Sequence, residues 1–460
     1  MLVDALKLPA ETLVETDICI IGAGAAGITL ARELRDRPEQ VCLLESGGFD
    51  YEEQIQSLYA GENTGLAYFP LKEARGRYFG GSTNLWGGWS RPMDEIDFEH
   101  RPWMPYSGWC FPKAELDPYY ERAQTACHLG AFEYDLAYWQ EALAQQCQVP
   151  ATTEQLATYL WQIIPCTHLR FGEAYRAEIE QASNITTYLH ANVLEIETNE
   201  GAQAVTRLRV ASSDGKQFSV AAKIFVLAAG GIENPRLLLA SNRVQSGGVG
   251  NQYDLVGRFF MEHPYLISGT AELSNSAELY TRIKFPVGET FLATGLGLSK
   301  EVQEREQILN FGLRLLAIDE WLEAYKRLRS QTQQSVRHKA FPSIAEGRKN
   351  AGKSSTIADF IKVASRPDRF ADRMTKKLFQ QSIAARQFNS CDTHLIGEQA
   401  PNPDSRVTLS RDRDRLGMNR VQLDWRLSPI DKYTIARSQQ LIAAEFERSG
   451  LGKIHIELTD

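Results

Sequence analysis

Residues 17–46 read DICIIGAGAAGITLARELRDRPEQVCLLES, and this stretch decides the fold. It opens with a short run rich in β-branched residues and passes through three glycines spaced GxGxxG. Apolar residues at helical spacing follow, and a second apolar run covers 41–44. The order strand, turn, helix and strand predicts a βαβ unit. The chain has 460 residues, which is enough for about two or three domain-sized cores.

The glycine motif at Gly22, Gly24 and Gly27 predicts a dinucleotide site. The first glycine permits a tight turn, the second lets the backbone approach a pyrophosphate, and the third lets the helix pack on the strand. Glu45 follows 23 residues after Gly22 (45 − 22), where a carboxylate accepts hydrogen bonds from ribose hydroxyls and disfavours the 2′-phosphate of NADP. FAD and NAD both present an ADP moiety, so this unit alone does not separate them. A glycine turn without a dinucleotide is the structural alternative.

Composition excludes several other classes of protein. The 50 Lys and Arg against 58 Asp and Glu give a net charge of −8, so the chain has no basic footprint for nucleic acid. The seven cysteines never form CxxC and lack metal-ligand spacing with histidine, so we expect no metal site and a reducing compartment. The first residues show no signal-peptide pattern, and no apolar window reaches about 18 residues, so we expect a cytoplasmic protein.

Four further segments carry a resemblance to a known family. They read GRYFGGSTNLWGG over 76–88, VLAAGGIENPRLL over 226–238, VGRFFMEHP over 256–264 and EQAPNPDSRV over 398–407. In this order, together with residues 17–48, they resemble the glucose–methanol–choline (GMC) oxidoreductases, and the resemblance covers nearly the whole chain. The family's cofactor is FAD, bound by a domain assembled from distant segments.

The resemblance implies a set of cofactor residues. Residues 80–88 would run along the flavin and pyrophosphate, the strand ending at Ala228 would pass the phosphates before a helix starting at Asn234-Pro235, and the Val193 backbone would contact adenine. Some relatives carry a histidine linked covalently to FAD where this chain has Asn84, so we expect dissociable FAD. The predicted cofactor residues are Gly22, Gly24, Ala25, Ala26, Gly27, Glu45, Ser46, Gly80, Gly81, Ser82, Thr83, Asn84, Gly87, Gly88, Val193, Ala228, Ala229 and Gly230.

We therefore expect an α/β fold with two parts. A Rossmann-like FAD-binding domain would comprise residues 1–110 and 185–262, and a substrate domain with an antiparallel sheet and helices would comprise 111–184 and 263–460. Within the first, 185–222 predicts an antiparallel meander and 223–231 a buried strand running into glycines. Within the second, 320–387 reads as polar and helical. The basic stretch 321–390 is either a solvated helical face or a site that binds an anionic partner, an acidic substrate or a membrane surface.

The function implied by the resemblance is oxidation of a CH–OH group. Hydride would pass from an alcohol or sugar-like substrate to flavin N5, and the electrons would then pass to oxygen, a quinone or a protein. The sequence does not choose among these acceptors, and we expect a dehydrogenase rather than an oxidase. GMC relatives use a histidine near the C-terminus as proton acceptor, and the residues after Arg448 lack that motif. His263, His394 and Glu398 are the titratable residues in family-like motifs, and the resemblance places the last two at the start of a strand over the substrate cavity. Structural roles are the alternative for these residues, and no base is assigned.

Three hypotheses follow from the missing motif. The first is a dehydrogenase completed by a second polypeptide or by a segment absent from this sequence. The second is a shortened flavoenzyme that uses another base, His263 or His394, or no external base at all. The third is a degenerate FAD-binding protein that acts through binding.

Overall fold

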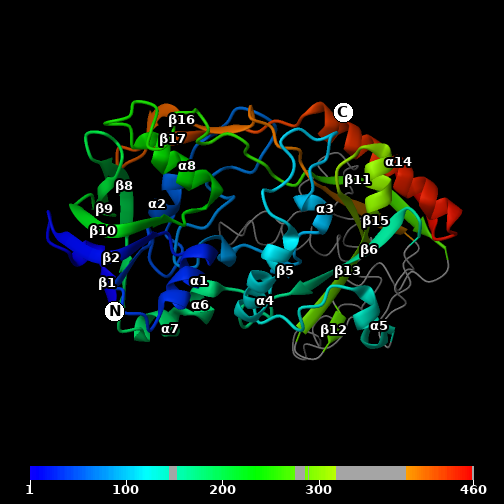
Figure 1. Ribbon diagram of the computed structural model, residues 1–460, viewed down its shortest axis with the longest axis horizontal. Helices are drawn as coiled ribbons and strands as arrows, with labels where there is room; N and C mark the ends of the chain where they lie inside the picture. The colour runs from blue at the N-terminus through cyan, green and yellow to red at the C-terminus, as the bar shows by residue number, and fades with distance from the viewer. Residues whose placement is uncertain (145–152, 275–284, 288–289, 318–389, 458–460) are drawn as a thin grey trace, which may run out of the picture.

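Two large β-sheets lie side by side along the length of the molecule (Figure 1). The computed structural model describes residues 1–144, 153–274, 285–287, 290–317 and 390–457. The N-terminus lies by the first sheet, and helix α14 (Pro429–Arg448) runs along the outer side of the second. Among the described residues, every helix is too short or too polar to span a membrane.

The first sheet contains the predicted βαβ unit. Its seven strands follow the order β1-β7-β3-β2-β10-β9-β8. The first five strands in this order pair in parallel, and the last three, β10, β9 and β8, pair antiparallel. All four residues of β3 are buried, because a parallel strand is covered on both faces. The strands are β1 (Leu2–Asp4), β2 (Leu13–Ile21), β3 (Val41–Leu44), β7 (Ile185–Leu189), β8 (Ala191–Thr198), β9 (Val205–Ser212) and β10 (Gln217–Leu227).

Both faces of the parallel strands are packed. On one face, helix α1 (Ala25–Leu34) buries Ile28 against Ile20 and Leu43. On the other face, the β8–β10 meander folds over the sheet and shares a core with Cys19 and Leu44. The α/β architecture predicted from the sequence is thus confirmed.

Two strand predictions within 185–231 were wrong in detail. The first strand of the expected meander, β7, runs parallel between β1 and β3, because β3 is buried and needs a backbone partner on its second edge. The run 223–227 is the second half of the single long strand β10 rather than a separate buried strand. Ile224 is 55% exposed there, because it lies outside the apolar cluster that α1 builds on this face.

The helix expected to start at Asn234-Pro235 starts earlier. Helix α8 spans Gly230–Ala240, with Pro235 inside it. The Asn234 Oδ1 atom accepts a hydrogen bond from the Ala229 N–H at 2.9 Å, which fixes the first turn ahead of the proline. Pro235 has no N–H to donate to the preceding turn, so the helix gives up one backbone hydrogen bond at this position.

The second sheet is antiparallel throughout. Its order is β18-β11-β15-β14-β13-β6-β5, with β12 paired to β13. Helix α14 covers one face, where Phe446 and Ile442 pack against Leu313 and Leu395. The strands are β5 (Trp89–Ser90), β6 (Leu156–Ile163), β11 (Tyr265–Leu273), β12 (Phe285–Val287), β13 (Thr290–Leu298), β14 (Phe311–Ala317), β15 (Ser390–Gly397) and β18 (Gly452–Ile456).

A small third sheet joins β4 (Glu62–Asn63), β16 (Arg406–Arg413) and β17 (Asn419–Asp424) beside α8. The other α-helices in the described part of the chain are short. They are α2 (Glu53–Gln56), α3 (Glu95–Phe98), α4 (Asp117–Ala126), α5 (Leu136–Ala144), α6 (Phe171–Ala174), α7 (Arg176–Gln181) and α10 (Lys300–Glu306), with 3-10 turns η1 (Ala5–Lys7), η2 (Ser57–Tyr59), η3 (Gly81–Asn84) and η4 (Lys113–Glu115).

The domain boundaries drawn from the sequence stay a prediction, and the packing differs from them locally. Residues 89–90 belong to the second sheet as β5, although they fall within 1–110. Helices α6 and α7 pack with α1 in the core of the first sheet, although they fall within 111–184. The helical segment 320–387 lies outside the described residues, as does the basic stretch 321–390 except for its last residue.

We predict that Phe446→Ala lowers the free energy of unfolding by about 3–5 kcal/mol, because Phe446 is fully buried between α14 and the second sheet. Denaturant unfolding followed by circular dichroism measures this. The control Tyr433→Ala, on the same helix but 50% exposed, should change stability by under about 0.5 kcal/mol. Equal effects of the two variants would contradict the packing described.

Candidate functional site: a glycine cradle beside a cavity

The glycine bend after β2 is closely packed at Gly22 and Gly27 and open at Gly24. Gly22 has φ 105°, and a Cβ there would lie 2.8 Å from the Ala228 carbonyl oxygen. A Cβ on Gly27 would lie 1.9 Å from the Gly22 carbonyl oxygen, so the close packing of α1 on β2 requires glycine. Above Gly24, by contrast, the nearest atom to such a Cβ is the Gly81 Cα at 4.0 Å. The N-terminus of α1, including Ala25 and Ala26, has no side-chain cap, so its N–H donors are free to bind an anion.

Glu45 points at this bend from the end of β3. Its Oε2 atom accepts from the Ala23 N–H and its Oε1 atom from the Gly47 N–H, both at 3.0 Å. Burial raises the pKa of this carboxyl, while the two backbone donors oppose the rise. A carboxylate has about four lone-pair sites, so both oxygens can still accept from hydroxyls. The sequence predicted the ribose contact and missed that Glu45 also fixes the shape of the bend.

The second glycine segment, 80–88, touches the first. Gly80 has φ 98°, and its N–H donates to the Ala23 carbonyl at 2.8 Å. A Cβ on Gly81 would lie 2.9 Å from the Gly24 Cα, so a side chain at Gly81 would push the two loops apart. The two segments predicted to contact FAD are therefore brought together.

Several polar side chains of this segment are engaged within the protein. Thr83 Oγ1 donates to the Gly80 carbonyl at 2.7 Å, and Asn84 Nδ2 donates to the Phe79 carbonyl at 3.0 Å. Ser82 Oγ accepts from the Gly76 N–H at 3.4 Å. These side chains shape the loop, so any contact of theirs with a cofactor stays a prediction. Glycines 87 and 88 lie close to Trp89 and Leu169, respectively.

The third segment is the turn from β10 into α8. A Cβ built on Gly230, which has φ 86°, or on Gly231 would meet no atom within 4 Å. The Ala228 carbonyl lies against Gly22, so this turn, which includes Ala229, adjoins the glycine bend. We call the open space at Gly24, Gly230 and Gly231 the glycine cradle. Gly231 was not predicted as a cofactor residue, and only its position next to Gly230 indicated such a role.

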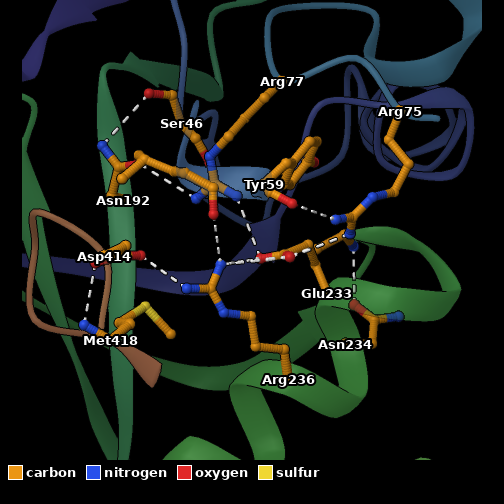
Figure 2. Close-up of polar contacts among 12 residues, drawn as sticks. Ser46, Tyr59, Arg75, Arg77, Asn192, Glu233, Asn234, Arg236, Asp414 and Met418 are labelled. Carbon is orange, nitrogen blue, oxygen red and sulfur yellow. Dashed lines mark hydrogen bonds and ion pairs between the residues drawn. The ribbon is translucent and has the colours of Figure 1, made fainter. Parts of the chain in front are cut away.

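Val193 and Ser46 lie at the meander side of the bend. Val193 is buried on β8 and belongs to the core that the meander forms with the sheet. Next to it, Asn192 donates from Nδ2 to the Ser46 carbonyl at 3.4 Å, just after Glu45 (Figure 2). The contact of the Val193 backbone with adenine and the contact of Ser46 with the cofactor stay predictions.

A buried ionic cluster lies behind this turn (Figure 2). Glu233 of α8 forms ion pairs of 3.1–3.3 Å with Arg75, Arg77 and Arg236, and Arg236 also pairs with Asp414 at 2.7 Å. We call these five residues the Glu233 cluster. Burial alone would raise the pKa of Glu233, but the three guanidinium groups outweigh it and lower the pKa to about 2. The cluster therefore ties α8, the segment before the 80–88 loop, and the β16–β17 turn together.

Beyond the 80–88 loop lies a cavity of about 1120 Å³ between the second sheet and residues 89–109. We call it the sheet cavity. Trp89, the residue after Gly88, is part of its wall, so the cavity begins where the predicted flavin loop ends. Two of the three candidate bases, His263 and Glu398, also line it.

The three candidate bases have different surroundings. The Glu398 carboxylate forms a two-pronged ion pair with Arg101, and its Oε2 also accepts from the Asn310 N–H at 3.0 Å. His394 is buried and hydrogen bonded to the Tyr265 hydroxyl, and burial together with Arg314 lowers its pKa to about 4. His263 is 69% exposed, and its nearest carboxylate, Glu262, lies 3.9 Å away. His394 and Glu398 lie in and just after β15, so the expectation that they begin a strand was wrong.

Most titratable residues of the sheet cavity were not predicted from the sequence, and two of them, Asp97 and Arg314, have perturbed pKa values. Burial and the nearby Glu398 raise the pKa of Asp97 to about 6. Arg314 projects from β14, and its guanidinium carbon lies 4.2 Å from the centre of the Trp89 ring. Neither stands in a recognisable motif, so only the fold brings them to the cavity.

Comparison with known proteins assigns the family. A family model described as FAD dependent oxidoreductase matches residues 17–246, half of the chain. The chain therefore belongs to the FAD-dependent oxidoreductase family, and its cofactor is FAD. The predicted class, an FAD-dependent oxidoreductase, is thus confirmed by the family model, and the GMC-type resemblance is borne out in the fold.

Individual relatives are more distant. The fold is similar to pyridoxine 4-oxidase from Mesorbium loti, with a TM-score of 0.52 and 18% identity over 96% of this chain and 84% of that one. A formate oxidase variant from Aspergillus oryzae gives a TM-score of 0.48 at 14% identity, over 98% and 84%. The fructose dehydrogenase large subunit of Gluconobacter japonicus is 42% identical over 76 residues, which is 16% of this chain and only 14% of that protein.

The residues present fit FAD. The glycine cradle leaves space where a Cβ at Gly24, Gly230 or Gly231 would meet no other side chain. The uncapped N-terminus of α1 offers N–H donors for a pyrophosphate, and Glu45 offers acceptors for ribose hydroxyls.

We predict that Gly24→Ala and Gly231→Ala each weaken FAD binding at least about tenfold while leaving the fold intact, because the added methyl groups enter only the cradle. Flavin-to-protein absorbance after gel filtration and FAD titration of the apoprotein measure the effect. Gly201→Ala, in an exposed turn remote from the cradle, is the matched control. Full flavin retention by both cradle variants would show that the space serves another purpose.

We predict that Glu233→Gln lowers the free energy of unfolding by about 3 kcal/mol at pH 7, because three buried guanidinium groups lose their carboxylate. Glu33→Gln, at the exposed pair with Arg122, should lose under about 1 kcal/mol.

The difference between wild type and Glu233→Gln should also depend on pH. Since the folded pKa of Glu233, about 2, lies below the ordinary 4.5, the stabilisation is complete above about pH 5 and declines as pH falls toward 2. The difference should therefore shrink by about 1 kcal/mol between pH 7 and pH 3.5. A difference independent of pH would indicate that Glu233 is not ionised in the folded protein.

Proposed function

We propose that this protein oxidises a CH–OH group of an alcohol or sugar-like substrate bound in the sheet cavity, with non-covalent FAD as acceptor. The observation that carries the proposal is the continuity of the glycine cradle, the 80–88 loop and the cavity, since Trp89 directly follows the loop and lines the cavity. When bound, FAD supplies a hydride acceptor at N5. The C–H hydride and the O–H proton leave the substrate, and a C=O bond forms.

The chain's own residues would orient the substrate and accept the proton. Among the three candidates, His263 is the one that lines the cavity without a side-chain hydrogen bond to another described residue, so we propose it as the proton acceptor. Glu398 forms an ion pair with Arg101, and His394 is hydrogen bonded to the Tyr265 hydroxyl. Asn84 donates to the Phe79 carbonyl, which supports a dissociable cofactor rather than a side-chain link.

A second candidate function is FAD binding without activity unless another polypeptide completes the site. The relative named fructose dehydrogenase large subunit supports this arrangement, because a large subunit implies a partner, although the match covers only 14% of that protein. We also propose a dehydrogenase that passes electrons to an acceptor other than oxygen.

We predict that the purified protein shows flavin absorbance, that acid precipitation releases the flavin, and that an alcohol or sugar bleaches it under anaerobic conditions. A screen of alcohols and sugars in an anaerobic cuvette tests this. Reoxidation by an artificial acceptor faster than by air would support the dehydrogenase.

His263→Asn should slow flavin reduction about 10²-fold or more while flavin content stays constant. Bound flavin that no substrate reduces would support the binding protein instead. A protein without flavin, even after reconstitution with FAD, would overturn the proposal.

A further inference from the structure

Arg314 places a cation on the cavity face of the second sheet. On β14, Leu313 and Leu315 pack toward α14, so Arg314 between them points to the opposite face. There it pairs in register with His394 of β15 and lines the sheet cavity. Its position is set by strand alternation rather than by a mobile loop.

Aromatic rings form a floor beside this guanidinium. Gly297 and Gly295 of β13 lack side chains, and Cβ atoms there would meet the rings of Tyr159 at 2.0 Å and Trp161 at 2.9 Å. These rings therefore lie across the sheet. Trp89 packs edge-on to Trp161, with ring centres 5.8 Å apart, and supports Arg314 by a cation–π contact. The floor suits the carbon skeleton of a flat or apolar substrate.

The other charged groups of the cavity already have partners. Arg91 pairs with Asp94, and Arg101 pairs with Glu398. The Tyr68 hydroxyl donates to Glu262 at 2.9 Å, and the Asp94 N–H donates to Asp97 at 2.8 Å. Each carboxylate at the wall thus has a donor within the protein.

Arg314 is different, because no carboxylate of the described residues pairs with it. The groups that face it are the His394 imidazole, the Tyr265 hydroxyl and the Trp89 ring. Burial lowers the pKa of Arg314 from its ordinary value, which is the expected effect of removing a cation from water without a counter-ion. A ligand anion would supply the missing charge.

We propose that the substrate carries a carboxylate, which Arg314 binds while the aromatic floor packs its carbon skeleton, so that the cavity selects hydroxy acids over neutral alcohols. The planar guanidinium matches a carboxylate with two parallel hydrogen bonds. The four carboxyl groups at the wall, Asp94, Asp97, Glu262 and Glu398, disfavour a doubly charged phosphate. This inference rests on the proposed function, since it names the substrate class of the same cavity.

The binding test uses benzoate and neutral benzamide as probes of the holoenzyme, measured by calorimetry. Wild type should bind benzoate at least about tenfold more tightly than benzamide, and Arg314→Gln should abolish that preference without weakening benzamide. Arg314→Lys should retain part of it, because it keeps the charge but loses the planar fork. Arg305→Gln, at an exposed side chain of α10, is the control.

The kinetic test compares 4-(hydroxymethyl)benzoate with 4-(hydroxymethyl)benzamide and adds inorganic phosphate as a competitor. Arg314→Gln should raise KM about tenfold or more for the acid alone, with unchanged flavin content, and phosphate should compete poorly. Benzoate binding that is absent in wild type or unchanged in Arg314→Gln would overturn the inference, as would strong competition by phosphate. Failure of every alcohol to reduce the flavin would defeat the proposed function instead, while the binding arm would still judge Arg314.

Discussion

The buried carboxylate of Glu233 is the interaction on which the cofactor region depends. A carboxylate removed from water is unfavourable unless opposite charges compensate it, and here Arg75, Arg77 and Arg236 do so together. Because these residues come from separate segments, their charges can be satisfied only when those segments assemble. The Glu233 cluster thus couples the placement of α8 to that of the 80–88 loop, because the loop begins three residues after Arg77 in the chain.

The glycine cradle follows from that assembly. The Glu45 carboxylate accepts from the Ala23 N–H in the bend and from the Gly47 N–H in the turn after β3. The Ala23 carbonyl accepts from the Gly80 N–H, so three turns are joined by hydrogen bonds to main-chain groups. Only glycines allow backbones to approach so closely. The same property leaves space above Gly24, Gly230 and Gly231, and this open space is what a pyrophosphate and its ribose need. The glycines therefore account both for the close packing of the turns and for the open space of the glycine cradle.

The sequence predicted those parts of the fold that local patterns encode. The run 17–46 contains a glycine turn, an amphipathic helix and two apolar strands, and each of these can be recognised from a few consecutive residues. It did not predict the Glu233 cluster, since no spacing rule joins Arg77 to Glu233 across 156 residues. The start of α8 predicted from Pro235 was wrong. The hydrogen bond from the Ala229 N–H to Asn234, which fixes the first turn, cannot be inferred from helix-start preferences alone. Arg314 was not predicted for a third reason. Its proposed role depends on its having no carboxylate partner among the described residues, and its neighbours are known only from the strand register.

The two sheets divide the chemistry of the molecule between them. The first sheet offers backbone amides and one carboxylate, groups that recognise the constant part of a cofactor regardless of substrate. The second sheet offers side chains on an antiparallel face, where each position can vary without disturbing the hydrogen-bonded ladder. Trp89 belongs to the second sheet and connects it with the cofactor region, because it follows the glycine loop in the chain and contacts Arg314 at the cavity wall. A substrate bound against Arg314 would therefore be located relative to the 80–88 loop through a single rigid ring, which is the geometric condition for a reacting carbon to meet its acceptor.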